Sequence, residues 1–298
     1  MNFLADQIGA DGKIAGEGYY EIGEDMKLRH VDDAKALAYM KEKAAVKGAG
    51  FKVDEASVIV TDGKTKQSLR LPKGDPIFDK AGPMGWPRAL REVVTERNLL
   101  NAHGTVYVVP REDAGGYRLM KPVATHNKLI YDFCTWRGML ALTGALAGAA
   151  NDGHLIASDD GKAGLWFGVV DDLWSFGKPR GVGGPWKKSA VKSGEPSDPY
   201  LMTNYDKKTL ELSHDASAEV EFKVEVDVVA GIDKAAWSVY KTIKVPPRET
   251  VRHEYPDGTI KVPPRQTVRH EFPEGYNAHW ARVTANRDCA ATAWFIYE

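Results

Sequence analysis

The sequence predicts a mainly β protein with a single helix near the N-terminus. Short segments rich in β-branched and aromatic residues recur between residues 51 and 175, and turn signals such as Asp62-Gly63 separate them. Residues 220–228 alternate apolar and charged side chains, as in a strand with one face on a core and one in water. Helical periodicity is clear over residues 32–47. We therefore expect partial β-propeller-like meanders followed by a β-sandwich-like module.

The expected elements follow in chain order from that helix. Before residue 176 the strand segments are 56–61, 67–72, 104–110, 129–136 and 162–170, and after residue 200 they are 209–213, 218–229 and 292–297. Residues 176–200 are crowded with glycine and proline, so we expect a long ordered loop there with Trp186 as its anchor. The resulting parts are an irregular segment with the helix (1–50), a propeller-like meander region (51–213) and a sandwich-like module (214–298).

The last part contains an internal repeat. Ile243–Gly258 returns as Ile260–Gly275 with a period of 17 residues, and the two copies differ at three of 16 positions. A sheet built for one copy must accommodate two. We expect one copy to dock in the sheet and the other to form a protruding or edge-added hairpin, through which chains could self-associate. The repeated His253 and His270 lack a third ligand at metal-site spacing, so a duplicated surface strand is the preferred interpretation of this tandem duplication (243–275).

Composition places the chain among ordinary globular proteins. Hydrophobic residues make up 43% and charged residues 27% of 298 positions, which excludes a disordered or disulfide-dense chain. The 40 basic and 41 acidic residues give a formal charge of −1, which argues against nucleic acid or an anionic membrane as partner. The sequence has no bilayer-spanning apolar run and does not open with a secretory signal. Localisation stays open, as does a disulfide between Cys134 and Cys289.

Familiar catalytic and nucleotide-binding signatures are missing. The sequence has no Gly-x-Gly-x-x-Gly between a strand and a helix, no P-loop, no Gly-x-Ser-x-Gly and no His-Glu-x-x-His. We therefore expect no nucleotide cofactor, and a Rossmann dehydrogenase, P-loop kinase, α/β-hydrolase or zincin is disfavoured.

Tryptophans close to turns and carboxylates are the candidate substrate-binding residues, because a flat indole can stack on a sugar ring while acids bond to its hydroxyl groups. Buried core anchors are the alternative interpretation of these tryptophans, which are Trp136, Trp174 and Trp186. Asp171 and Asp172 are candidates for acid/base catalysis or for binding Ca²⁺. Asp159 and Asp160 are candidate metal ligands, with a simple turn before Gly161 as the alternative.

Three histidines in loop-like contexts are candidates for a general base or a metal ligand: His103, His126 and His154. They would share one pocket if loops gathered on one face of a propeller, and a structural role for each is the alternative. Arg137, beside Trp136, is a candidate for stabilising an anionic intermediate.

Four strings carry a resemblance to known proteins: Glu92–Thr105, Asp132–Gly138, Gly164–Trp174 and Gly183–Trp186. They resemble a group of poorly characterised bacterial proteins that are β-propeller-like and end in a β-sandwich-like module. The resemblance covers residues ~50 to 298 and implies that this chain is the C-terminal part of a longer protein. It brings no catalytic residue with it, because the group has no established mechanism.

Three functions remain open from the sequence. The favoured one is a hydrolase or lyase acting on a carbohydrate or a related small polar substrate, built on the residues above. The second is a calcium-dependent esterase or lactonase, for example one acting on acyl lactones, in which Ca²⁺ polarises the ester carbonyl. The third is a non-catalytic module that binds a glycan or a partner through its tryptophans.

Overall fold

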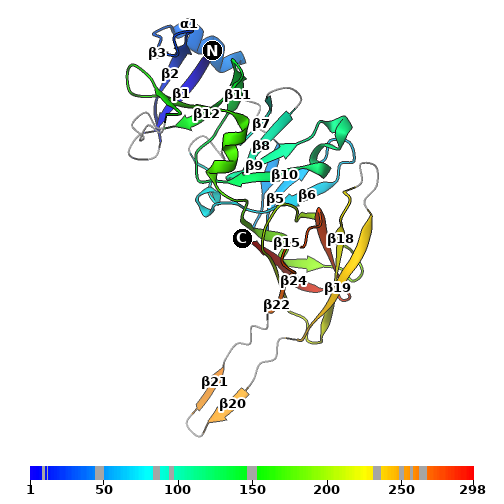
Figure 1. The fold of residues 1–298 in the computed structure, drawn as a ribbon. Helices are drawn as coiled ribbons and strands as arrows, with labels where there is room; N and C mark the ends of the chain where they lie inside the picture. The colour runs from blue at the N-terminus through cyan, green and yellow to red at the C-terminus, as the bar shows by residue number, and fades with distance from the viewer. Residues whose placement is uncertain are drawn as a thin grey trace. The chain divides into compact units, whose positions relative to one another are not determined.

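A computed structural model describes residues 1–8, 11, 13–43, 50–82, 88–93, 97–145, 153–230, 236–247, 252–255, 258–261 and 267–298 (Figure 1). The chain forms two compact units. Unit 1 comprises residues 1–49, 74–111 and 123–178, and unit 2 comprises residues 50–73, 112–122 and 179–298. The boundary expected near Ser213 instead falls inside a strand, β17 (Lys208–His214).

Unit 1 contains small antiparallel sheets, in agreement with the mainly β class. Its first sheet is β1 (Asn2–Ile8), β2 (Ile14–Ile22) and β3 (Leu28–His30). The second has the order β10-β9-β8-β7, with bounds Lys121–Thr125, Thr105–Val109, Arg97–Ala102 and Arg88–Val93. The third has the order β11-β12-β14-β13, with bounds Phe133–Trp136, Met139–Ala145, Gly164–Gly168 and Leu155–Ala157. Closure of such sheets into a propeller stays a prediction.

The helix predicted over 32–47 is confirmed in its described part as α1 (Ala34–Lys43). Asp33 caps it, because its Oδ1 accepts the backbone N–H groups of Lys35 and Ala36, each at 2.9 Å. Residues 44–47 lie outside the described residues. In its described part, unit 1 also has the 3₁₀ turns η1 (Pro76–Phe78) and η4 (Val170–Phe176), whereas η2 (Glu112–Ala114) and η3 (Gly116–Leu119) belong to unit 2.

Unit 2 is a β-sandwich. One sheet has the order β19-β18-β23-β16-β6-β5-β4, with bounds Trp237–Val245, Val220–Asp227, Trp280–Ala285, Tyr200–Leu201, Ser68–Leu71, Val58–Thr61 and Phe51–Val53. The other has the order β15-β24-β17-β22, in which β15 is Gly181–Val191, β24 is Cys289–Tyr297 and β22 is Val268–Glu271. Phe222 and Val283 of the first sheet share one buried cluster with Leu210 and Phe295 of the second. Side chains from two facing sheets thus form a single core.

The long loop expected over 176–200 is corrected, because its central residues form the strand β15. The glycines and the proline of β15 allow close packing and bulges in this strand, whereas we expected them to form a loop. A Cβ at Gly184 would lie 1.8 Å from the backbone oxygen of Ala293, so only glycine allows β15 to approach β24 here. The register shifts between Gly183 and Trp186, and Pro185 sits in that irregularity, where a missing N–H is tolerated.

The expectation for the repeat is corrected in one respect: a hairpin does form apart from the two sheets, but neither copy docks as a whole. Ile243–Val245 of the first copy ends β19, and Val268–Glu271 of the second copy forms β22 in the other sheet. The leftover halves pair with each other as β20 (Arg252–Tyr255) and β21 (Gly258–Lys261), a hairpin apart from both sheets (Figure 1).

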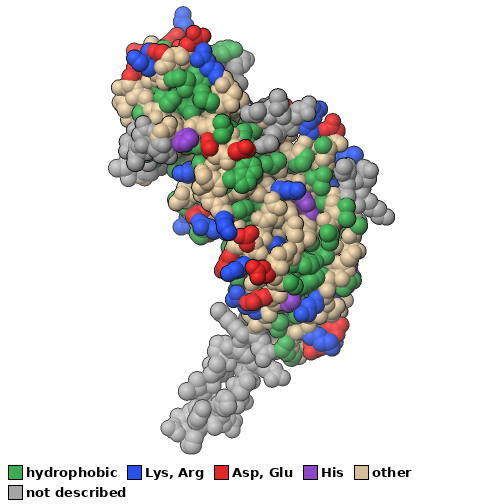
Figure 2. Space-filling model, viewed as in Figure 1, with side chains coloured by type: hydrophobic (Ala, Val, Ile, Leu, Met, Phe, Trp, Pro, Cys, Tyr) green, Lys and Arg blue, Asp and Glu red, His purple; other side chains and the backbone are tan. Residues whose placement is uncertain are grey.

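Three further expectations concern the cysteines, membrane-spanning helices and the balance of charge. Cys134 and Cys289 are free thiols, one in each unit, and burial raises the pKa of both. No helix within the described ranges has the length and apolar character needed to cross a membrane. On the face drawn in Figure 2, acidic and basic side chains are interspersed, which fits the balanced charge of the sequence.

Candidate functional site

The η4 turn presents an acid and an indole side by side. In a 3₁₀ helix, residues i and i+3 eclipse each other. One line of η4 therefore holds Val170 and Leu173, which are buried in the core of unit 1. The next line holds Asp171 and Trp174, which are exposed, Trp174 to 53%. We call Asp171 and Trp174 together the η4 face.

The segment before η4 fixes that turn in place. The Oδ2 atom of Asp172 accepts the backbone N–H of Val169 at 2.7 Å. The same Oδ2 lies 2.5 Å from where a Cβ at Gly168 would be, and the indole of Trp166 lies 2.2 Å from that point. Only glycine leaves room for both groups. Asp172 is thus a capping residue, whereas Asp171 points to the exposed side.

Beneath the turn, a chain of ring contacts links the three predicted histidines. His103 contacts Phe78 at 6.1 Å between ring centroids, and Phe78 contacts His126 at 6.4 Å. His126 contacts Phe176 of η4 at 6.2 Å, and the chain continues through Trp166 to His154, with centroid distances of 5.3 and 5.0 Å. The structure therefore places the histidines in one aromatic layer of unit 1, joined through intervening rings.

His126 is buried and held as a neutral ring. Its Nδ1 accepts the Lys128 N–H at 3.1 Å, so Nε2 carries the proton and faces Oδ1 of Asn101 at 3.2 Å. The Asn101 amide in turn donates to the Ile130 carbonyl at 2.7 Å. Burial lowers the pKa of His126 to about 4. His103 is buried too, with Nε2 3.5 Å from a carboxylate oxygen of Asp79. Both histidines are placed to hold the layer together.

His154 differs because its ring is only partly buried. Its Nδ1 lies 2.7 Å from the Phe167 carbonyl, which can only accept, so Nδ1 carries the proton. The ring stacks on Trp166 at an interplanar angle of 14°. A neutral imidazole in this tautomer keeps its lone pair on Nε2, which is the arrangement that a general base needs.

Trp136 and Arg137 lie on the other side of the same sheet. Arg137 and Gly138, both with positive φ, form the two-residue turn between β11 and β12. Trp136 packs on Phe167, whereas Asp172 lies over Gly168 on the face shared with Trp166. Since alternate residues of β14 point to opposite faces, these groups are separated by the sheet. Arg137 pairs with Glu24 at 3.2 Å.

The remaining predicted residues have partners elsewhere. Trp186 belongs to unit 2 and packs against its core. The Oδ1 of Asp159 accepts the N–H of His30 at 2.9 Å. Asp160 accepts bonds from the hydroxyl groups of Ser158 and Tyr20, at 2.6 and 3.2 Å. Asp159 thus links its turn to β3, and Asp160 stabilises the turn itself. The described residues contain no group of three or more His, Cys, Asp or Glu arranged to hold a metal.

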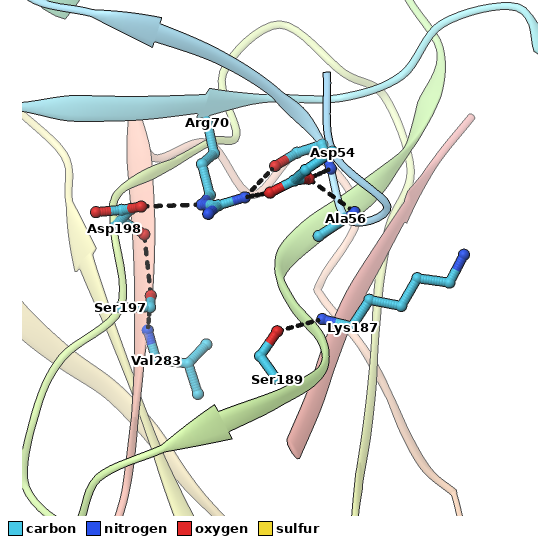
Figure 3. Close-up of polar contacts among 9 residues, drawn as sticks. Asp54, Ala56, Arg70, Lys187, Ser189, Ser197, Asp198 and Val283 are labelled. Atoms are coloured by element: carbon cyan, nitrogen blue, oxygen red, sulfur yellow. Dashed lines mark hydrogen bonds and ion pairs between the residues drawn. The ribbon is translucent and has the colours of Figure 1, made fainter. Parts of the chain in front are cut away.

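Sequence reasoning missed a polar network in unit 2 that centres on Arg70 of β6 (Figure 3). Its guanidinium lies between Asp54, at 2.7 Å, and Asp198, at 3.0 Å, and also donates to Ser57 at 2.9 Å. Burial by itself would raise the pKa of Asp54. The hydrogen bonds from Arg70, Ser57 and Ala56 lower the pKa by more than burial raises it, so the net shift is downward. The network ties β6 to two loops. No sequence signal identifies it, because its members are up to 144 residues apart in the chain.

Buried polar groups also occur at the end of β18 in unit 2. Asp227 is fully buried, and its carboxylate lies 3.8 Å from the guanidinium of Arg118. The neighbouring His279 donates from Nε2 to the Met120 carbonyl at 2.9 Å, and burial lowers its pKa to about 4. The Trp280 indole donates to the Arg118 carbonyl at 2.8 Å. These contacts hold residues 118–120 against the sheet.

Comparison with known proteins yields no family. No protein-family model matches the chain, and no curated protein matches it. Among solved structures, the chain aligns with the GH32 β-fructofuranosidase of Bombyx mori, both unmodified and as a mutant in complex with sucrose. Each alignment has 10% identity, covers 98–99% of this chain and 76% of the other, and gives a TM-score of 0.18 or 0.19. TM-scores this low give no basis for assigning a fold or a function to this chain.

Proposed function

We propose that this protein binds a carbohydrate or a related small polar molecule on the η4 face. The observation that carries the proposal is the alignment of an exposed carboxylate, Asp171, with a half-exposed indole, Trp174, on a turn that buried residues hold from below. A large aromatic side chain on a rigid support loses little conformational freedom when a ligand covers it.

The two side chains supply complementary interactions. The indole of Trp174 offers a flat apolar face to the C–H face of a pyranose or furanose ring, and such contacts are worth about 1 kcal/mol each. The carboxylate of Asp171 accepts hydrogen bonds from ring hydroxyl groups, and bonds to a charged acceptor are worth about 1.5–3 kcal/mol. Together they favour neutral polyols over anionic ligands.

Cleavage of the bound sugar, by a hydrolase or lyase reaction, is the second candidate function. It is favoured by His154, whose Nδ1 donates to the Phe167 carbonyl so that the lone pair is on Nε2, and by Asp171 as an exposed acid/base group. His103, His126, Asp172 and Arg137 are left out of this scheme. The first two are buried, Asp172 caps η4, and Arg137 pairs with Glu24.

The experiment is a binding titration against immobilised oligosaccharides, namely fructans, β-glucans, xylans and chitooligosaccharides. Trp174→Ala should weaken binding about tenfold, which corresponds to ~1.4 kcal/mol, and Asp171→Asn should weaken it similarly. Tyr39→Ala is the matched control, because Tyr39 is an aromatic residue of unit 1 that is 61% exposed on α1. Equal binding by all four proteins would refute the proposal.

The same samples separate binding from cleavage. If the protein cleaves, reducing ends or unsaturated products accumulate on long incubation, and His154→Gln stops their formation while binding is retained. Saturable binding without product identifies a glycan-binding module.

A further inference from the structure

The two sheets of unit 2 use the repeat as if it were a single copy. Residues 242–245 pair with β18 as the end of β19, and residues 268–271 pair with β17 as β22. One copy alone contains both segments, separated by five residues. The other halves are left for the β20–β21 hairpin.

A single copy is long enough to join the two sheets. The Val245 carbonyl accepts a hydrogen bond from Nε2 of His214 at 2.9 Å, and Val268 pairs with Leu212, two residues earlier on β17. The end of β19 and the start of β22 therefore both lie next to β17, at His214 and Leu212. Five residues span up to about 20 Å between their flanking residues, whereas packed sheets lie ~10 Å apart.

We propose that the place of β22 on β17 accepts either copy of the repeat, so that the chain has a second register in which Val251–Tyr255 replaces Val268–Phe272. The two segments are identical except for their last residue. Every pairing along β17, from Leu212 to Thr209, would be reproduced. The partners of His270, which are Tyr240 at 3.1 Å and Lys241 at 3.5 Å, would meet His253 instead.

The last residue decides which register prevails. Phe272 is buried among the rings of Tyr240, Tyr276 and Phe295, with centroid distances of 4.9, 5.6 and 6.3 Å. Tyr255 would bring a hydroxyl group into this apolar position, and an unpaired buried hydroxyl disfavours that register roughly five- to hundredfold. The described register also keeps the tight β20–β21 hairpin, in which Tyr255 pairs with Gly258.

The place of β19 is not exchangeable in the same way. Trp237–Lys241 precede the repeat and pair with β18, from Asp227 to Val224. Shifting the second copy into β19 would break these pairings, because residues 254–258 do not repeat that sequence. The exchange is therefore confined to β22.

Disulfide trapping under oxidised glutathione tests the proposal. Arg269 lies opposite Glu211 on β17, and their side chains approach to 3.9 Å. Facing residues of antiparallel strands are about 4.5–5.5 Å apart at Cα, within disulfide range. In a C134S/C289S background, E211C/R269C reports the described register and E211C/R252C the second one. E211C/K261C is the control, because Lys261 belongs to the hairpin but does not correspond to Arg269 in the repeat.

We expect an intramolecular disulfide in E211C/R252C that forms more slowly than in E211C/R269C and faster than in the control. Adding Y255F/F272Y exchanges the deciding residues and should raise the E211C/R252C yield at least fivefold. Trapping of E211C/R252C no faster than the control, or only as a covalent dimer, would overturn the proposal. A disulfide in E211C/R269C shows in the same experiment that the C134S/C289S background and the shared E211C substitution leave β17 and β22 paired, and the melting transition of each variant shows that it folds.

Discussion

Deleting residues 246–262 is expected to leave unit 2 folded and to stabilise it. The deletion joins Val245 to Pro263, so one uninterrupted copy of the repeat remains. Ile243–Val245 keeps its place in β19, and Val268–Glu271 keeps its place in β22. The β20–β21 hairpin and its turn disappear.

The size of the effect follows from the connecting segment. Between Val245 and Val268 the chain has 22 residues, of which five remain after the deletion. Loop-closure entropy scales as (3/2)RT ln n, so shortening the segment stabilises the folded state by about 1.3 kcal/mol. For a unit of roughly 150 residues, this corresponds to a rise in Tm of about 3–5 °C.

Differential scanning calorimetry measures the transition of unit 2. A second variant, in which a Gly/Ser linker of equal length replaces residues 246–262, separates the hairpin from the loop length. If the hairpin adds no stability, this variant melts with the parent and the deletion variant melts above both. A deletion variant that melts several degrees below the parent, or that loses its cooperative transition, would refute the single-copy interpretation.

Three further predictions address the fold and the alternatives. His126 and His279 have pKa values of about 4, below the unfolded value near 6.5, so the unfolded chain binds more protons between these pH values. The free energy of unfolding should therefore be full above pH 6.5 and fall towards pH 4, by about 3 kcal/mol for each histidine. An NMR titration should show that neither ring becomes protonated above pH 5. Gly144→Ala should destabilise unit 1 by at least ~2 kcal/mol in urea unfolding, because the new Cβ would lie 1.8 Å from the Leu129 carbonyl oxygen at φ +84°. Gly153→Ala, with φ +93° but open space around the Cβ, should cost less, and equal costs would contradict the steric argument. Because Asp159 and Asp160 already accept hydrogen bonds from His30, Ser158 and Tyr20, EDTA followed by excess calcium should leave the melting midpoint unchanged. A calcium-reversible shift of several degrees would favour the calcium-dependent esterase or lactonase.

Local patterns predicted the strands better than they predicted loops. The alternation at 220–228 indicated β18, because one of its faces is buried and the other is largely polar. The glycines of 181–184 were interpreted as loop residues, because composition does not distinguish a flexible loop from a strand that approaches its neighbour closely. The contact of Gly184 with Ala293 shows the second case, and it depends on a residue more than 100 positions away.

The candidate site was predictable only in part. The acidic and aromatic side chains of residues 171–174 indicated a candidate site. The sequence did not predict the 3₁₀ turn η4, whose three-residue period distinguishes Asp171 from Asp172. The burial of His103 and His126 was not predictable, because it depends on Phe78, which reaches them from η1. The grouping of Trp136 with Trp174 failed because strand alternation puts Trp136 and Asp172 on opposite faces of the sheet.

The most direct test of the central claim is oligosaccharide binding by the parent chain and by Trp174→Ala. We predict saturable binding of at least one neutral oligosaccharide by the parent, about tenfold weaker binding by Trp174→Ala, and unchanged binding by Tyr39→Ala. If the parent binds no member of the panel, or if both variants bind as the parent does, the η4 face is not a carbohydrate site.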